Sequence, residues 1–266
     1  MEEETKKVID PTTGEEYKNI VGDEFLRNNL DIVRKDLRKD YDCFFVISGR
    51  EGYGKSTLAA QIALYLDPTY NLSRCTFTAE QFEQAVLTAD KYQAVVFDET
   101  MGYLGSRGAM SKFNRRLIKI MSEMRSRNLI VILCIPSFFE LDKYPAMHRS
   151  TGLIHVPKRG MYQSFDYRKK KSIYIYGKKT YSITAAPSFY GSFTKYFPLE
   201  KKAYEEKKQT AIAEWDTKTS VETRYEDQRN RMILYCYIDL KYTQKRIGEL
   251  IGLTQQQIAR ILENVS

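Results

Sequence analysis

Residues 49–57 have the composition and spacing of a loop that binds phosphate groups. The pattern G-x-x-x-x-G-K-[ST] is met by Gly49, Gly54, Lys55 and Ser56. Glycines let such a loop wrap around phosphate oxygens, so that main-chain N–H groups form an anion-binding nest. Lys55 would reach the β- and γ-phosphates and Ser56 would bind Mg²⁺, whereas the alternative is an ordinary glycine-rich turn. The predicted nucleotide-binding residues are Gly49, Glu51, Gly52, Tyr53, Gly54, Lys55, Ser56 and Thr57.

Two acidic residues, Asp98 and Glu99, follow the apolar run at 94–97, about forty residues after the loop. An aspartate at the end of a strand beside a phosphate loop holds Mg²⁺, usually through water. The adjacent glutamate is suited to polarise the attacking water as a general base. Acidic turns commonly end strands, so the pair gains its meaning from its place after the loop. We predict Asp98 and Ser56 as metal ligands, and Glu99 and Lys55 as catalytic residues.

These residues need a scaffold, and four short apolar runs predict one. The runs do not alternate with polar residues, and helical patterns separate them, which indicates a parallel sheet covered on both faces. The fold class is therefore α/β. The expected strands are 43–47, 94–97, 129–134 and 153–156, and the expected helices are 23–39, 58–66, 78–90 and 112–127.

The sequence changes character after about residue 157. Residues 161–168 and 172–184 are rich in Tyr, Phe and Ile and predict antiparallel strands with basic turns. The lysines at 169–171 and 178–179 suit either a loop that faces DNA or a solubilising hairpin tip. The predicted domains are an N-terminal arm and helix (1–42), a core with an antiparallel extension at about 161–184 (43–199), a helical linker (200–220) and a C-terminal helical domain (221–266).

Residues 244–263 have the pattern of a helix-turn-helix unit. Apolar residues recur at the spacing that packs two short helices together, while Gly248 leaves room for the crossing helix and Gly252 allows the turn. The second helix would enter the major groove, where Gln pairs with adenine and Arg with guanine. A protein contact is the alternative role of such a unit. The predicted DNA-binding residues are Thr254, Gln255, Gln256, Gln257 and Arg260.

With these motifs, residues 44–157 resemble the additional-strand, catalytic-glutamate division of P-loop ATPases, with a RecA/AAA-like core. That resemblance implies ATP and Mg²⁺ as cofactors and a homo-oligomeric ring. It also implies that Ser137 senses the γ-phosphate, for which a helix cap is the alternative. Arg149 would be the arginine finger that acts on a neighbouring subunit, with Arg125 and Arg127 as rivals. These arginines could instead neutralise a helix C-terminus.

The stretch from Phe97 to Asp142 is also similar to the zonula-occludens-toxin-like and FtsK–HerA-like ATPases of viruses and mobile elements. This resemblance implies an ATPase that packages or translocates double-stranded DNA. The toxin-like proteins commonly carry a membrane segment, and the longest apolar run here, 129–136, is far shorter than the roughly 20 residues that a span needs. We therefore expect no membrane span and a cytoplasmic protein.

The composition is compatible with this interpretation. The chain has 266 residues, of which 42% are hydrophobic, and a formal net charge of +8. That excess suits an anionic partner such as double-stranded DNA, but also a solvated basic surface. Two functions remain open: a viral or mobile-element DNA motor, or an ATP-switched DNA-binding factor such as a replication initiator, helicase loader or partition regulator. A motor would be stimulated by long duplex of any sequence, whereas a switch would hydrolyse slowly.

Overall fold

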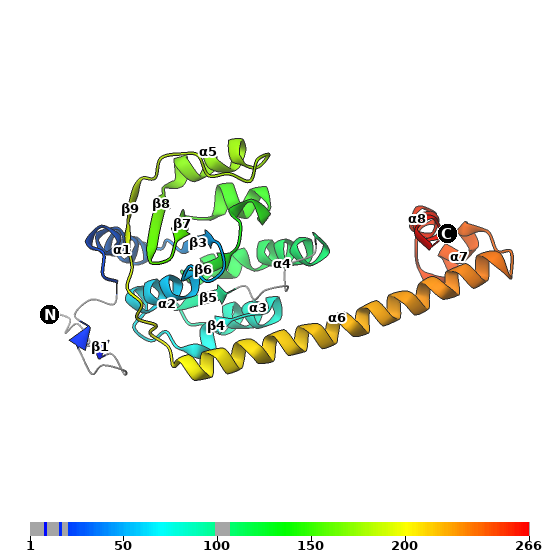
Figure 1. Ribbon diagram of the computed structural model, residues 1–266, viewed down its shortest axis with the longest axis horizontal. Helices are drawn as coiled ribbons and strands as arrows, with labels where there is room; N and C mark the ends of the chain where they lie inside the picture. Colours follow the sequence, from blue (N-terminus) through cyan, green and yellow to red (C-terminus); the bar gives the residue numbers. More distant parts are fainter. Residues whose placement is uncertain (1–7, 10–15, 18–20, 99–106, 266) are drawn as a thin grey trace. The chain divides into compact units, whose positions relative to one another are not determined.

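The computed structural model describes residues 8–9, 16–17, 21–98 and 107–265. The chain divides into two compact units, Met1–Ala211 and Ile212–Ser266 (Figure 1). One long helix, α6 (Lys201–Ile238), contributes residues to both units. In the first unit a minor antiparallel pair is formed by β1 (Val8–Ile9) and β2 (Glu16–Tyr17).

A seven-stranded sheet organises the first unit, in the order β4-β5-β6-β3-β7-β8-β9. The pairs among the first five strands are parallel, and β8 and β9 add antiparallel pairs at one edge. The bounds are β3 (Cys43–Gly49), β4 (Cys75–Thr76), β5 (Ala94–Asp98), β6 (Ile130–Ile135), β7 (Gly152–Lys158), β8 (Met161–Phe165) and β9 (Phe189–Ser192). The parallel sheet expected from the four apolar runs is confirmed.

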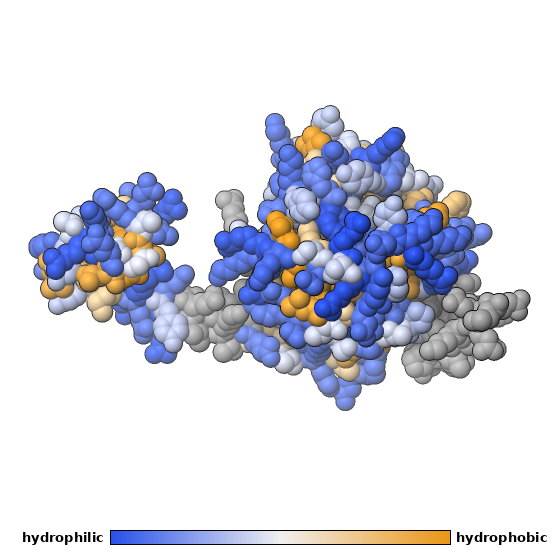
Figure 2. Space-filling model, turned by 180° about the vertical axis from the view of Figure 1, so that it is seen from behind, coloured by the Kyte–Doolittle hydropathy of each residue, from blue (hydrophilic) through white to orange (hydrophobic). Residues whose placement is uncertain are grey.

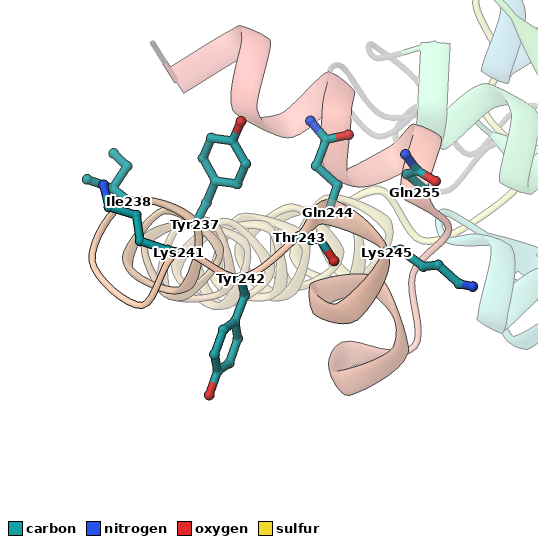
Figure 3. Close-up of a pocket in the computed structure, with 8 residues that line it drawn as sticks. All are labelled: Tyr237, Ile238, Lys241, Tyr242, Thr243, Gln244, Lys245 and Gln255. Carbon is teal, nitrogen blue, oxygen red and sulfur yellow. The ribbon is translucent and has the colours of Figure 1, made fainter.

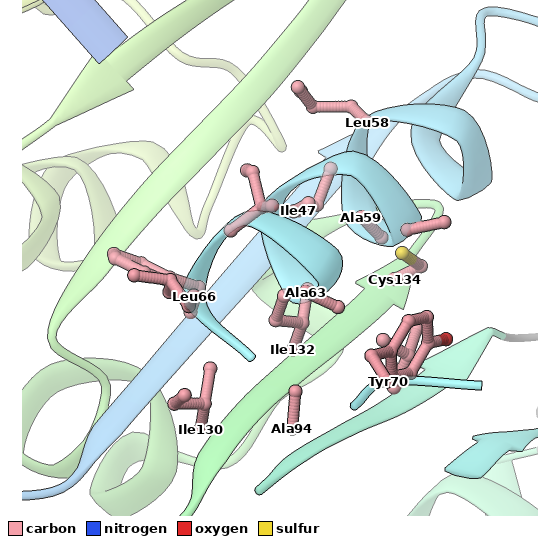
Figure 4. Packing of buried hydrophobic residues seen from close by; sticks show 14 of the residues in the cluster. Ile47, Leu58, Ala59, Ala63, Leu66, Tyr70, Ala94, Ile130, Ile132 and Cys134 are labelled. Carbon is pink, nitrogen blue, oxygen red and sulfur yellow. The ribbon is translucent and has the colours of Figure 1, made fainter. Parts of the chain in front are cut away.

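Both faces of the central strands are buried, because alternate side chains point to opposite sides of a sheet. On one face Ile47 and Ile132 pack against α2 (Lys55–Leu66), as Figure 4 shows. On the other face the Phe97 ring stacks on Phe113 of α4 with 4.8 Å between centroids. The helices of this unit besides α6 are α1 (Glu24–Leu37), α2 (Lys55–Leu66), α3 (Ala79–Thr88), α4 (Arg107–Ser126) and α5 (Tyr167–Gly177), with short turns η1 (Leu72–Arg74), η2 (Phe138–Glu140) and η3 (Tyr144–Arg149).

The start of α3 illustrates how local sequence sets these elements. Thr78 is the N-cap, and its hydroxyl oxygen accepts a hydrogen bond from the Gln81 N–H at 3.2 Å. The Gln81 side chain in turn accepts from the Phe77 N–H at 3.0 Å. Such reciprocal bonds satisfy N–H groups that a helix start leaves unpaired. The helix predicted at 78–90 is therefore confirmed, with Thr78 as its cap.

The predicted strand at 172–184 is wrong, because residues 172–177 lie in α5 and residues 178–184 form turns and irregular structure. Asp166 caps the helix by accepting from the Arg168 and Lys169 N–H groups, and the buried face consists of Lys170, Ile173, Tyr174 and Gly177. This spacing is helical, but the pattern is not evident in the sequence because one of the buried positions is a lysine. Lys170 is fully buried and donates to the carbonyl oxygens of Ala146 and Met147, both at 2.9 Å.

The second unit is a three-helix assembly formed by the end of α6 with α7 (Gln244–Ile251) and α8 (Gln255–Val265). Ile233, Ile247, Ile258 and Leu262 form its buried core. Gly248 is required by packing, since a Cβ atom there would lie 2.4 Å from the Leu253 carbonyl oxygen. Gly252 ends α7 in the left-handed conformation with φ 71°. The helix-turn-helix arrangement expected for this stretch is confirmed.

On the face drawn in Figure 2, hydrophobic residues form only small patches among polar ones. None of the helices within the described residues has the length and apolarity to cross a membrane. The four cysteines form no disulfide, and three of them are buried.

Candidate nucleotide-binding site

The strand order brings the phosphate loop and Asp98 together at the carboxyl ends of the parallel strands. β6 lies between β3 and β5, and Cys134 of β6 pairs with Asp98 on one side and Ile47 on the other. Because all three strands are parallel, Asp98 lies level with Ile47, two positions before Gly49. One strand, β6, thus separates the loop strand from the acidic strand.

The loop has the conformation and donors to surround phosphate groups. Gly54, the residue before α2, has φ 98°, a value that strongly favours glycine. The Lys55 ammonium is turned back onto the loop and donates to the Gly49 carbonyl oxygen at 2.7 Å and the Arg50 carbonyl oxygen at 3.2 Å. The start of α2 adds N–H groups and the positive end of the helix dipole. A triphosphate therefore fits the residues present.

Ser56 and Asp98 meet at a third residue, Tyr204 of α6. The Tyr204 hydroxyl donates to Asp98 Oδ2, and the Ser56 side chain lies close to the same hydroxyl. Asp98 is only 3% exposed and Tyr204 only 5%. Burial and the Asp98 carboxylate raise the pKa of Tyr204 far above its usual value, so the hydroxyl stays protonated. The serine hydroxyl and the carboxylate are hard oxygen ligands of the type that Mg²⁺ prefers.

Other predicted site residues have different outcomes. Glu99, the predicted base, lies outside the described residues. Ser137 is the N-cap of η2, with its hydroxyl accepting from the Phe139 N–H at 3.4 Å, which corresponds to the alternative of a helix cap. Within the loop, Glu51 is exposed, whereas Tyr53 and Thr57 are partly buried.

Arg149, the predicted arginine finger, is held by a partner within its own chain. Its guanidinium forms an ion pair with Asp42, and the two side chains are only 15% and 6% exposed. Asp42 immediately precedes β3, whereas the phosphate loop follows it, and the seven residues of β3 span roughly 20 Å. Arg149 therefore lies at the amino ends of the strands, away from the phosphate loop of its own chain. The rival Arg127 donates to the carbonyl oxygens of Leu87 and Ala89.

A segment that no motif marked out, residues 193–207, packs beside the phosphate loop. The Phe193 ring lies 3.0 Å from where a Cβ atom of Gly54 would be. Gln61 of α2 is fully buried and donates to the carbonyl oxygens of Thr194 and Tyr196, at 3.1 and 2.6 Å. The sequence gives little local signal for these contacts, because they join residues more than 130 positions apart.

In the second unit, the predicted DNA-binding residues lie at the start of α8. Gln255, Gln256 and Arg260 are exposed. Gln257 instead takes part in a capping box: its side chain accepts from the Thr254 N–H at 2.8 Å, and its own N–H donates to Thr254 Oγ1 at 3.3 Å. Thr254 is thus the cap that the sequence predicts.

A hollow of about 590 Å³ adjoins these residues, shown in Figure 3. It lies where the end of α6, the turn after it and the starts of α7 and α8 come together, with Lys241 and Lys245 among its lining residues. The Tyr237, Ile238, Tyr242, Thr243, Gln244 and Gln255 side chains complete the lining.

Comparison with known proteins agrees with this geometry. Residues 29–139 match the family model described as Novel STAND NTPase 3, a segment that includes the phosphate loop, Asp98 and β6. No curated protein matches the chain. Together, the strand order, the phosphate loop and this match show that the chain contains a P-loop nucleotide-hydrolase core, and that residues 29–139 of it are similar to the STAND type.

Proposed function

We propose that the chain is an Mg²⁺-dependent ATPase that acts on double-stranded DNA, and that ATP switches its binding to DNA. The observation that carries the DNA proposal is the helix-turn-helix unit, which presents Gln255, Gln256 and Arg260 to solvent on α8. These side chains have the hydrogen-bonding groups that read adenine and guanine in the major groove. When bound, Mg²⁺ would neutralise charge on the phosphates beside Ser56 and Asp98.

Two features favour the switch over a packaging or translocation motor. The residue that was expected to act between ring subunits, Arg149, is paired with Asp42 inside its own chain. The helix that ends in the DNA-binding unit, α6, begins with a turn whose Tyr204 contacts Asp98. A single helix therefore has contacts in the NTPase site and in the core of the second unit, which suits a change of state better than continuous movement along DNA.

The positive charges near α7 and α8 allow the salt dependence of DNA binding to be predicted. Residues 212–266 contain eight Lys or Arg and eight Asp or Glu, so the excess of +8 belongs to the first unit. Lys241, Lys245, Arg246 and Arg260 are exposed near α7 and α8. If these four contact phosphates, the logarithm of the binding constant should fall against log salt with a slope of about −3.6.

Replacing Arg260 by alanine is expected to weaken DNA binding by roughly five- to 150-fold, from a loss of about 1–3 kcal/mol at a base-contacting arginine. Fluorescence anisotropy with a labelled duplex, repeated across a salt series, measures this. Lys39→Ala removes one positive charge from an exposed site in the first unit and serves as the control. Equal affinities for wild type and Arg260→Ala would argue for a protein-binding role of the unit.

The same preparation separates the switch from the motor. A switch should hydrolyse ATP slowly and gain little from long non-specific duplex. A motor should be strongly stimulated by duplex of any sequence, and such stimulation would favour the packaging or translocation function that the similarity at residues 97–142 implies.

A further inference from the structure

Tyr204 engages the two groups that are suited to hold magnesium. Its hydroxyl donates to Asp98 Oδ2 and lies close to the Ser56 side chain. Asp98 is buried, so its carboxylate depends on protein partners rather than on bulk water. The phenol oxygen therefore shares its polar neighbours with the metal site.

Mg²⁺ requires near-octahedral oxygen coordination and usually retains several water molecules. A hydrated ion held by Ser56 and Asp98 would need the space and the hydrogen-bonding positions that the Tyr204 hydroxyl uses. We propose that Tyr204 is a gate on the magnesium site, which Mg²⁺ and nucleotide must displace in order to bind. The proposal rests on the P-loop fold and is independent of the DNA-binding proposal.

The Tyr204 ring is held in place by its surroundings, so the contact is more than a loose surface interaction. Phe77 and Phe197 pack edge-on against it, with ring centroids at 5.3 and 4.8 Å. One turn further along α6, the Lys207 ammonium donates to the carbonyl oxygens of Leu72 and Cys75 at 2.9 and 2.7 Å. The gate is thus anchored on η1 and β4 as well as on the metal site.

Displacing the hydroxyl would affect α6. Tyr204 and Lys207 lie in its first two turns, and Ile233 near its other end lies in the core of the second unit. Binding of Mg²⁺ with nucleotide would therefore release the start of the same helix that carries the helix-turn-helix unit. In this way the gate gives the NTPase site a means to influence α6.

A positioning role would have the opposite consequence. If the hydroxyl only oriented Asp98 toward the metal, removing the hydroxyl would weaken the binding of Mg²⁺. If the hydroxyl competes with the metal, removing the hydroxyl strengthens the binding of Mg²⁺. The sign of the change therefore separates the two roles.

The test is Tyr204→Phe, which removes the hydroxyl and keeps the ring. A fluorescent, non-hydrolysable ATP analogue is titrated with Mg²⁺, and the Mg²⁺ concentration at half-maximal binding is measured. A hydrogen bond to a charged group contributes enough that this concentration should fall roughly tenfold or more. An unchanged or higher Mg²⁺ requirement would overturn the gate.

Tyr162→Phe is the matched control. Tyr162 is also buried, and its hydroxyl donates to the Asp23 carboxylate at 2.6 Å, at the start of α1 and away from the metal site. This variant loses a similar bond but should keep the Mg²⁺ requirement of the wild type. A fall as large as that of Tyr204→Phe would show a general loosening of the fold instead of a gate.

Hydrogen exchange of the wild-type chain gives a second readout that needs no variant. The analogue with Mg²⁺ should raise amide exchange at residues 201–207 several-fold, whereas the analogue with EDTA should not. Equal or slower exchange there with Mg²⁺ present would contradict displacement of Tyr204.

Discussion

Lys55→Ala is expected to weaken ATP binding by about a hundredfold or more, because charge-assisted hydrogen bonds to phosphate are among the strongest that a side chain makes. The Lys55 ammonium already lies at the loop, bonded to the carbonyl oxygens of Gly49 and Arg50. Nucleotide needs only to exchange these carbonyls for phosphate oxygens. The measurement is equilibrium binding of a fluorescent ATP analogue.

Lys91→Ala is the control for that experiment. Lys91 is exposed and lies over the Tyr92 ring, so its removal takes away one positive charge without touching the loop. Nucleotide affinity should stay at the wild-type value. If Lys55→Ala also binds ATP normally, the loop at 49–57 is not the phosphate site.

Glu99→Gln is expected to bind ATP and lose about 10²- to 10⁴-fold in turnover, the usual contribution of a general base. The amide keeps the shape of the side chain but cannot accept the proton of the attacking water. Glu99 follows Asp98 directly, and β5 brings Asp98 to the edge of the sheet that carries the loop. Phosphate release and analogue binding, measured on the same preparation, separate chemistry from affinity.

Asp90→Asn is a suitable comparison, since Asp90 is exposed and precedes β5 at its other end. It should hydrolyse ATP at the wild-type rate. A Glu99→Gln protein that turns over normally would show that the base is another residue, and Asp98 would then be the first to re-examine.

Much of the nucleotide site was predictable, because its signals are local. The runs at 43–47 and 94–97 are apolar for the length of a strand, and each is followed by residues whose chemistry suits the strand end. Parallel strands place their carboxyl ends together, so two local patterns are sufficient to predict one site. The same reasoning recovers the helix-turn-helix unit, whose Gly248 and Thr254 have the packing and capping roles expected of them.

The contacts that the sequence does not reveal are made by residues whose partners lie far away along the chain. A lysine such as Lys170 is expected to be exposed, yet Lys170 is buried and donates to carbonyl oxygens of η3. Because the sequence does not show this burial, a helix was predicted as a strand. Arg149 has the position of a finger, but only the fold reveals that Asp42 is beside it. Tyr204 contacts Asp98 across 106 positions, which no local pattern encodes.

The central claim is that Ser56, Asp98 and the loop form a single site for nucleotide and Mg²⁺. Its most direct test compares binding of the ATP analogue with Mg²⁺ and with EDTA, in wild type, Ser56→Ala, Asp98→Asn and the double variant. We expect Mg²⁺ to raise the affinity of the wild type, each single variant to lose that gain, and the double variant to lose little more. If Asp98→Asn keeps the whole of the Mg²⁺-dependent gain, the two residues do not share a metal site and the account is wrong.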